Sequence, residues 1–294
     1  MLLSSPATVE LPHGLYDVDG GCHRRAELRL LTGHEELLVA SAGVTLSHRA
    51  ENELLTSCVS RVGQFSPFDA SLAAALTRGD RHYLALRLRA QLFGDPLALV
   101  ARCAAPSCGA LVDLSLRISA LVSERPEPAP EHIEVTLPEG VASVREPTGE
   151  DDAWIESQDA TRAEKSALLW SRLVELEGQP LTPAQWKSLP APSRHRVAMA
   201  LAEEGSAPDL ALLSRCLSCG AWLELELDPF GILLREVGAG IDRLEAEVHC
   251  LAFHYHWSEE QILSLPRPRR WRYLEFLCRE LEGRPLVEGL GGLA

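Results

Sequence analysis

The sequence predicts an α+β protein, mainly helical, that is built from two similar repeats and a C-terminal helical segment. Three observations support this fold class. A series of short motifs occurs twice in the same order, alternating residues flank tight turns at both ends of each copy, and helix signals fill the middle. Each repeat should therefore open with a β-hairpin, continue through helices and close with a second hairpin that carries two cysteines at its tip.

The evidence for duplication is the shared order of the paired motifs. Because several matches in one order are hard to obtain by chance, we interpret the chain as an internal duplication. The matching pairs are ELPHG (10–14) with TLPEG (136–140), RLLTGHEE (29–36) with REPTGEDD (145–152), LLTSCVSRVG (54–63) with LLWSRLVELEG (168–178), LTRGDRHYLALRL (76–88) with LPAPSRHRVAMAL (189–201), and LALVARC (97–103) with LALLSRC (210–216).

The elements of each repeat follow in order from local signals. Alternating residues around PHG and PEG predict the opening hairpins. Thr32 with Glu35, and Thr148 with Asp151, have the spacing of a helix capping box, so a helix should begin at each Thr-Gly pair. The proline-rich stretch SERPEPAPEH predicts an extended linker. The expected organisation is a first repeat at 1–122, the linker at 123–132, a second repeat at 133–238 and a C-terminal helical segment at 239–294.

Composition restricts the class of protein. The 294 residues are 46% hydrophobic and carry a net charge of −14, whereas nucleic-acid-binding domains usually present a basic surface. The first residues, MLLSSPATVELPHG, lack the basic start of a signal peptide, and no apolar run approaches the length of a membrane span. We therefore expect a cytoplasmic protein that does not insert into membranes and does not bind nucleic acid. In that compartment cysteines stay reduced.

Four cysteines occupy matching places in the two repeats. Cys216-x-x-Cys219 followed by Gly220 has the spacing of a zinc knuckle, and Cys103-x4-Cys108 followed by Gly109 is a looser version. Each pair supplies half of a tetrahedron, so both hairpin tips should meet around one structural Zn²⁺ per chain. A complete set of four cysteines leaves no open position for catalysis. The alternatives are metal-free thiols, two separate metal sites and redox chemistry.

The C-terminal segment should form three helices, over 241–256, over 257–266 and after Pro268. RPRRWR (267–272) is a basic cluster in an acidic chain. It is either a solvated helix start or a docking patch for an acidic partner, and the candidate partner-binding residues are Arg269, Arg270, Trp271, Arg272 and Tyr273. His249, His254 and His256 lie near Cys250, but helical spacing does not place them on one face.

Motifs of catalysis are missing from the sequence. It contains no dinucleotide-binding glycine motif, no phosphate-binding loop, no nucleophile elbow and no metalloprotease motif. We therefore expect a protein that is not an enzyme and has no small-molecule substrate or organic cofactor.

Two stretches of the chain resemble proteins of contractile phage tails. Residues 8–120 resemble the baseplate hub assembly family of contractile tailed phages through ELPHG, LLTSCV, LTRGDRHYLALRLR, GDPLALVARC, the paired cysteines and VDLSLRI. Residues 245–280, with EVHCLAFHYHWSEEQILSLPRPRRWRYLEFL, resemble a helical segment of phage-tail-like contractile injection systems. The duplication and the Cys-x4-Cys spacing depart from the family pattern.

The resemblance implies a hub component or an assembly chaperone of a contractile injection particle, with other baseplate or tail-hub proteins as partners. Whether such a protein stays in the assembled particle is left open by the sequence. The alternative reading of the cysteines is a zinc-ribbon-like module with a regulatory or nucleic-acid-associated role, and the acidic charge opposes it.

Overall fold

A computed structural model describes residues 7–41, 48–123 and 126–283 of the chain. It is 48% helical and 24% strand, with small antiparallel sheets. This confirms the α+β class, but the strand share makes the fold mixed rather than mainly helical. The chain forms two compact units, a larger one from Met1–Arg29 and Leu46–Phe230 and a smaller one from Leu30–Thr45 and Gly231–Ala294.

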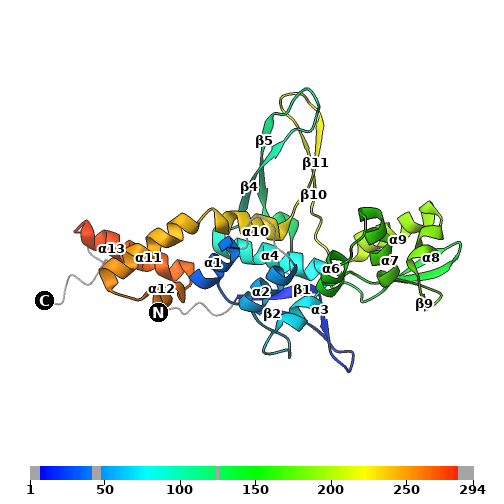
Figure 1. The fold of residues 1–294 in the computed structure, drawn as a ribbon, viewed down its shortest axis with the longest axis horizontal. Helices are drawn as coiled ribbons and strands as arrows, with labels where there is room; N and C mark the ends of the chain where they lie inside the picture. The colour runs from blue at the N-terminus through cyan, green and yellow to red at the C-terminus, as the bar shows by residue number, and fades with distance from the viewer. Residues whose placement is uncertain (1–6, 42–47, 124–125, 284–294) are drawn as a thin grey trace. The chain divides into compact units, whose positions relative to one another are not determined.

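The first part of the larger unit begins with a three-stranded sheet in the order β1-β2-β3 (Figure 1). Helix α2 runs directly into the third strand, and two further helices lead to a separate two-stranded hairpin, β4–β5. The bounds are β1 Ala7–Tyr16, β2 Cys22–Leu28, α2 His48–Cys58, β3 Val59–Val62, α3 Ala70–Ala75, α4 Arg78–Phe93, β4 Pro96–Arg102, β5 Leu111–Arg117 and α5 Ile118–Leu121.

The second part of the larger unit is similar in outline but also contains helix α6 and strand β9, which have no counterpart in the first part of this unit. A hairpin gains a strand that directly follows a helix, and a short helix and a long helix then lead to the two-stranded hairpin β10–β11. The bounds are β6 Ile133–Leu137, β7 Gly140–Val144, α6 Gly149–Glu156, α7 Arg162–Leu173, β8 Val174–Leu176, β9 Gln179–Pro180, α8 Pro183–Ser188, α9 Ala191–Glu204, β10 Ala211–Arg215 and β11 Trp222–Glu226.

Local sequence explains the starts of these elements. In β6 every second residue is buried, which is the pattern of a strand with one face on a core. The side chain of Thr148 accepts a hydrogen bond from the amide of Asp151, whose carboxylate accepts one from the Thr148 amide. This capping box starts α6 at Gly149, as the spacing predicts. At the start of helix α1 (Gly33–Ser41), the amide and the hydroxyl of Thr32 both donate to the carboxylate of Glu35.

In each part, the first turn of the long helix is hydrogen-bonded to the opening hairpin. The carboxylate of Asp80 on α4 accepts hydrogen bonds from the amides of His13 and Gly14, at 2.9 and 2.7 Å. Burial raises the pKa of Asp80 to about 6, although these two amide donors oppose the shift. On α9, the Ser193 hydroxyl donates to the carboxylate of Glu139 at 2.8 Å. Both contacts connect the third residue of a long helix to the opening hairpin. Glu139 lies in the β6–β7 turn, whereas His13 and Gly14 lie within β1 at a register shift. PHG is therefore not the predicted hairpin turn, which the structure places at 17–21.

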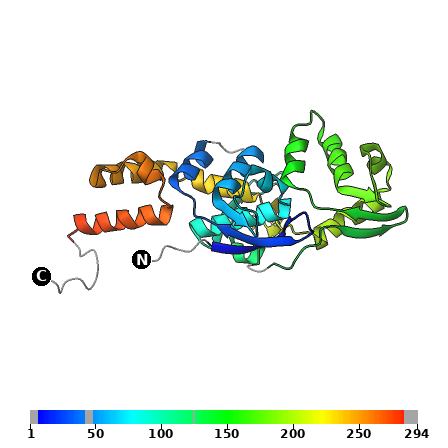
Figure 2. The ribbon, with the colours of Figure 1, turned by 90° about the horizontal axis from the view of Figure 1, so that it is seen from below.

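The smaller unit combines the C-terminal helices with a helix from near the start of the chain. It contains α11 (Ile241–Tyr255), α12 (Glu259–Leu263) and α13 (Arg267–Leu281), and α13 packs along α11 (Figure 2). Helix α10 (Pro229–Gly238) spans the division between the units. Helix α1 packs on α11 and α12. Residues 30–41 fall within the predicted first repeat, yet in the structure they belong to the unit of the C-terminal helices.

Each of the following predicted segments includes residues that the structure does not describe. These are 1–6 and 42–47 of the first repeat, 124–125 of the linker and 284–294 of the C-terminal segment. In the part of the chain that is described, no helix is both long enough and apolar enough to cross a bilayer.

Candidate metal centre

The four predicted cysteines lie at the tips of the hairpins β4–β5 and β10–β11, which lie side by side (Figure 1). The last paired residues are Arg102 with Leu111 and Arg215 with Trp222. One residue further, the amide of Cys103 donates to the Ala110 carbonyl at 2.8 Å, and the amide of Cys216 donates to the Ala221 carbonyl at 2.9 Å. The two first cysteines therefore occupy the same position of their hairpins.

A glycine closes each turn. Gly109 has φ +62° and Gly220 has φ +73°, which is the left-handed conformation that favours glycine. In the second hairpin the Gly220 amide also donates to the Cys216 carbonyl at 2.8 Å. The turn folds the second cysteine back over the first, so both sulfurs of a hairpin point in one direction.

The sulfurs of the two hairpins meet in a single cluster. Cys103 Sγ lies 3.6 Å from Cys219 Sγ, and Cys108 Sγ lies 3.7 Å from Cys216 Sγ. All four sulfurs lie within 4.8 Å of one another. A tetrahedral ion with Zn–S bonds of about 2.3 Å separates its sulfurs by about 3.8 Å. The cluster is therefore compatible with one four-coordinate metal ion that takes two of its four ligands from each hairpin.

Burial differs among the four ligands. Cys103 and Cys216 are buried, Cys108 is partly buried and Cys219 is exposed. The two buried cysteines belong to a small apolar cluster between the hairpins that also contains Ala101, Val112 and Leu223. The apolar side chains exclude water from the inner side of the sulfur cluster, whereas the side with Cys219 is open for an ion to enter.

Hydrogen bonds from backbone amides lower the pKa of one of the four thiols. The amides of Cys219 and Ser218 hydrogen-bond the sulfur of Cys216 and lower the pKa of this thiol to about 6. At Cys103 the amide of Ala105 acts in the same direction, but burial and hydrogen bonds with Cys219 and Cys216 outweigh it and raise the pKa to about 12.

The two arginines next to the first cysteines hold the turns and the strands. The Arg102 guanidinium donates to the Gly109 carbonyl at 3.1 Å, across its own turn. The Arg215 guanidinium stacks over the Trp222 ring at 4.3 Å from the centroid. Both bring positive charge to the rim of a cluster that would carry a net negative charge with a divalent ion.

The remaining cysteines and histidines form no comparable group. Among the described residues, the four-cysteine cluster is the one set of three or more His, Cys, Asp or Glu side chains placed to share a metal ion. Cys22, Cys58, Cys250 and Cys278 form no disulfide, and the described histidines near Cys250 do not join them in a metal-binding group. The Cys-x-x-Cys turn connects two strands, whereas redox motifs of the thioredoxin type lie where a strand meets a helix.

One of the predicted partner-binding residues belongs to the interior. Arg270 has 0% of its side chain exposed, and its guanidinium donates to Glu247 at 2.9 Å and to Glu36 at 2.7 Å. Its helical position faces the interior together with Arg267 and Leu277. The prediction that Arg270 belongs to a surface patch is therefore wrong.

The other four candidates are more accessible. Arg269, Trp271 and Arg272 are exposed, and Tyr273 is partly buried. The indole N–H of Trp271 donates to Glu247 at 2.6 Å, so this side chain is held in place although its ring remains 45% exposed. Nothing in the sequence near RPRRWR indicates Glu36 as a partner, because it lies on a helix at the other end of the chain.

A comparison of the chain with models of protein families, with curated proteins and with solved structures finds no match.

Proposed function

We propose that the protein is a metal-clipped structural or assembly protein, a baseplate hub component or hub assembly chaperone of a contractile phage-tail-like injection particle. The observation that carries the structural part of this proposal is the cluster of four sulfurs from two hairpins, whose cysteines Cys108 and Cys216 are separated by 107 intervening residues. The resemblance of ELPHG, LTRGDRHYLALRLR and the C-terminal segment to contractile-tail proteins supports the assembly context. The metal we propose is Zn²⁺, in a closed site without catalytic role.

The matching order of elements supports a duplication behind this site. In both parts of the larger unit a hairpin gains a strand that follows a helix, and a capped short helix then leads to a long helix and a cysteine-tipped hairpin. In this proposal, two copies of one zinc knuckle each contribute two cysteines to a single shared site. The chain gains a connection between two remote hairpins, which suits a protein that holds a fixed shape for its partners.

One tightly held zinc ion per chain is the first expected result. Protein purified without added metal should contain one equivalent of zinc by elemental analysis, because four thiolates in one cluster satisfy one tetrahedral ion. Cys216→Ser should lower the content to well below one equivalent. The matched control is Cys278→Ser, which changes an exposed cysteine outside the cluster. Two equivalents, or none, would contradict the shared site.

The assembly role is tested by the composition of the particles. We expect mass spectrometry of contractile particles and their assembly intermediates, purified from the source cells, to detect this chain with tail-hub proteins. Its absence from both would overturn the role. The zinc-ribbon alternative makes a different prediction, namely DNA or RNA binding at low salt, and the net charge of −14 argues against it.

A further inference from the structure

Three junctions between a short and a long helix have the same form. They are α3–α4, α8–α9 and α12–α13, with the sequences LTRGDR (76–81), LPAPSR (189–194) and LPRPRR (265–270). The residue before each long helix has nearly the same backbone angles: φ −60° and ψ 155° at Thr77, φ −54° and ψ 143° at Pro190, and φ −64° and ψ 146° at Pro266. Each junction has an arginine as its sixth residue.

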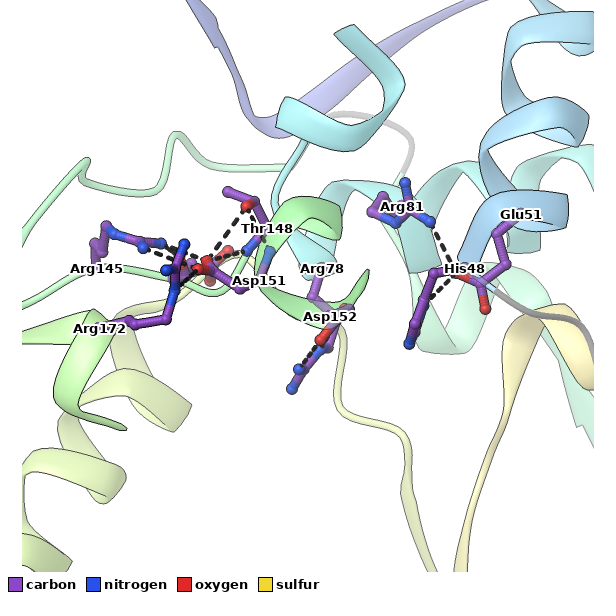
Figure 3. Close-up of polar contacts among 10 residues, drawn as sticks. His48, Glu51, Arg78, Arg81, Arg145, Thr148, Asp151, Asp152 and Arg172 are labelled. Carbon is purple, nitrogen blue, oxygen red and sulfur yellow. Dashed lines mark hydrogen bonds and ion pairs between the residues drawn. The ribbon is translucent and has the colours of Figure 1, made fainter. Parts of the chain in front are cut away.

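The first junction is covered by the start of an acidic helix. Thr148 forms an antiparallel bridge with Thr77, the Arg78 amide donates to the Pro147 carbonyl at 2.7 Å, and the Gly149 amide donates to the Leu76 carbonyl at 3.2 Å. Helix α6 then packs on α2 and α3. Its fourth residue, Asp152, pairs with Arg78 (Figure 3).

The acid before it, Asp151, keeps the same helix start in place. Arg145, Arg172 and the Thr148 amide surround its carboxylate and hold the pKa of Asp151 at about 2, against the effect of burial (Figure 3). This group is thus ionised at neutral pH, and it closes the capping box that presents Thr148 and Gly149 to the junction.

The junction of the smaller unit is covered in the same way by α1. Thr32 forms an antiparallel bridge with Pro266, and α1 packs on α11 and α12. The fourth residue of α1, Glu36, accepts a hydrogen bond from Arg270, the sixth residue of this junction, whereas the fourth residue of α6, Asp152, pairs with the third residue of its junction, Arg78. Both covering helices begin with Thr-Gly, and the glycine lies close to the junction: a Cβ at Gly33 would come within 2.7 Å of the Leu263 side chain and one at Gly149 within 2.6 Å of the Arg81 guanidinium.

The junction of α8 and α9 has no such cover among the described residues. Pro190 and Ala191 are exposed, whereas their counterparts Thr77 and Arg267 are buried and Arg78 and Pro266 are partly buried. In the described chain, the Leu189 carbonyl and the Ala191 amide have no hydrogen-bond partner, although the equivalent groups of Leu76 and Arg78 bind the Pro147–Gly149 segment.

The arginine of this junction is also left without an acid. Arg81 is 1% exposed and pairs with Glu51, and Arg270 is fully buried between two glutamates. Arg194 is only partly buried, yet its Nε is inaccessible to water and has no hydrogen-bond partner in the described part of the chain. Because Nε is covered in the uncomplexed chain, the partly exposed side chain has to turn outward to pair, and an incoming carboxylate supplies the acceptor oxygens that it lacks among the described residues.

We propose that the α8–α9 junction is a docking site for a helix of another protein that begins with Thr-Gly and carries acidic residues at its third and fourth positions. The fourth-position carboxylate pairs with Arg194, and the backbone around the glycine bonds the Leu189 carbonyl and the Ala191 amide. Both segments of this kind in the chain, at Thr32 and Thr148, already cover junctions, so the occupant comes from a different polypeptide. This docking site rests on the proposed assembly role in one respect: an assembly protein is expected to bind partner proteins.

A peptide with the sequence of residues 146–158, EPTGEDDAWIESQ, is the probe for this site. Fluorescence anisotropy with the zinc-loaded full chain should show saturable binding, and Arg194→Glu should weaken it by about tenfold or more, because the variant places two like charges together. The matched control is Arg196→Glu on the same helix, an exposed arginine that contacts the Thr136 carbonyl, and it should bind the peptide normally. A second control peptide with Gly149→Val and Asp152→Asn should not bind.

The outcomes separate the possibilities. Arg194→Glu should melt like the parent protein, because its side chain has no partner to lose among the described residues, so weaker binding reports the site itself. Absence of peptide binding, or binding that Arg194→Glu does not change, overturns the docking site and leaves the assembly role untouched. Self-association of the protein that Arg194→Glu abolishes would show that the occupant is a second copy, which contradicts a foreign partner.

Discussion

Removal of the metal should release the tips of the two cysteine hairpins while the rest of the larger unit stays folded. After treatment with a strong chelator, we expect amide hydrogen exchange over 103–110 and 216–221 to accelerate by about 100-fold or more, the change that corresponds to a ligand present at about 100 times its Kd. Exchange in the strands β6 and β7 should not change. The measurement is exchange followed by mass spectrometry on the metal-loaded and metal-free protein.

The physical reason is the small size of the core between the hairpins. Their inner faces share only a small buried cluster, in which Cys103 and Cys216 are themselves members. On the outer faces large apolar side chains are exposed to solvent: Val100, Leu111, Leu213 and Trp222. Without the ion, the thiols lose their common partner, and about 1 kcal/mol for each thiol contact with a neighbour is too little to fix two loops. The metal-binding free energy is therefore folding free energy for the tips.

A cysteine variant gives an independent check. Cys219→Ser should reproduce the chelated state, because it removes one of four ligands, whereas Cys278→Ser should leave exchange at the tips unchanged. Unaltered exchange in the chelated protein would show that packed thiols hold the tips without metal. Melting of the complete larger unit would show instead that the ion stabilises more than the hairpins.

The sequence predicts the metal ligands better than the surroundings of the C-terminal helices, and the reason is the range of the interactions. Cysteines with fixed spacing beside a glycine have a local geometry, and each pair lies at the tip of a hairpin formed by neighbouring stretches of the sequence. Arg270, in contrast, is buried by an acid 234 residues away, in a helix that local signals assign to the first repeat. From the local sequence alone, a cluster of arginines is predicted to be exposed to solvent, because the acidic residues that pair with it are remote in the sequence.

The same limit applies to the junctions of the helices. The likeness of LPAPSR to LPRPRR is visible in the sequence, and so is the recurrence of Thr-Gly followed by acids. Which Thr-Gly helix covers which junction is decided by tertiary packing: Thr148 bridges to Thr77, and Thr32 bridges to Pro266. The pairing crosses the boundaries of the predicted repeats, so deletion of 239–294 would uncover the buried side chains of Leu31 and Val39.

Replacement of Arg270 by Ala should destabilise the smaller unit by about 3–5 kcal/mol at neutral pH. The guanidinium is fully buried and binds Glu36, Glu247 and the Leu265 carbonyl. Without it two carboxylates remain close together in the interior, and each lacks the charge that compensated its desolvation. Native-state hydrogen exchange at the amides of α11 measures the free energy of opening. Arg269→Ala, at an exposed position of the same helix, should change it by no more than about 0.5 kcal/mol.

The pH dependence of this defect identifies its cause. Burial raises the pKa of Glu36 in the parent protein, against the opposing effect of Arg270, so loss of the guanidinium raises it further. Between the unfolded pKa and this raised value the folded variant binds more protons than the unfolded chain, so its stability increases as the pH falls. The difference between Arg270→Ala and the parent protein should therefore be smaller at pH 5 than at pH 8. Arg270→Met combined with Glu36→Gln and Glu247→Gln should recover most of the stability at both pH values, since no buried charge remains. A pH-independent defect that persists in the triple variant would show that the arginine stabilises the unit by packing alone.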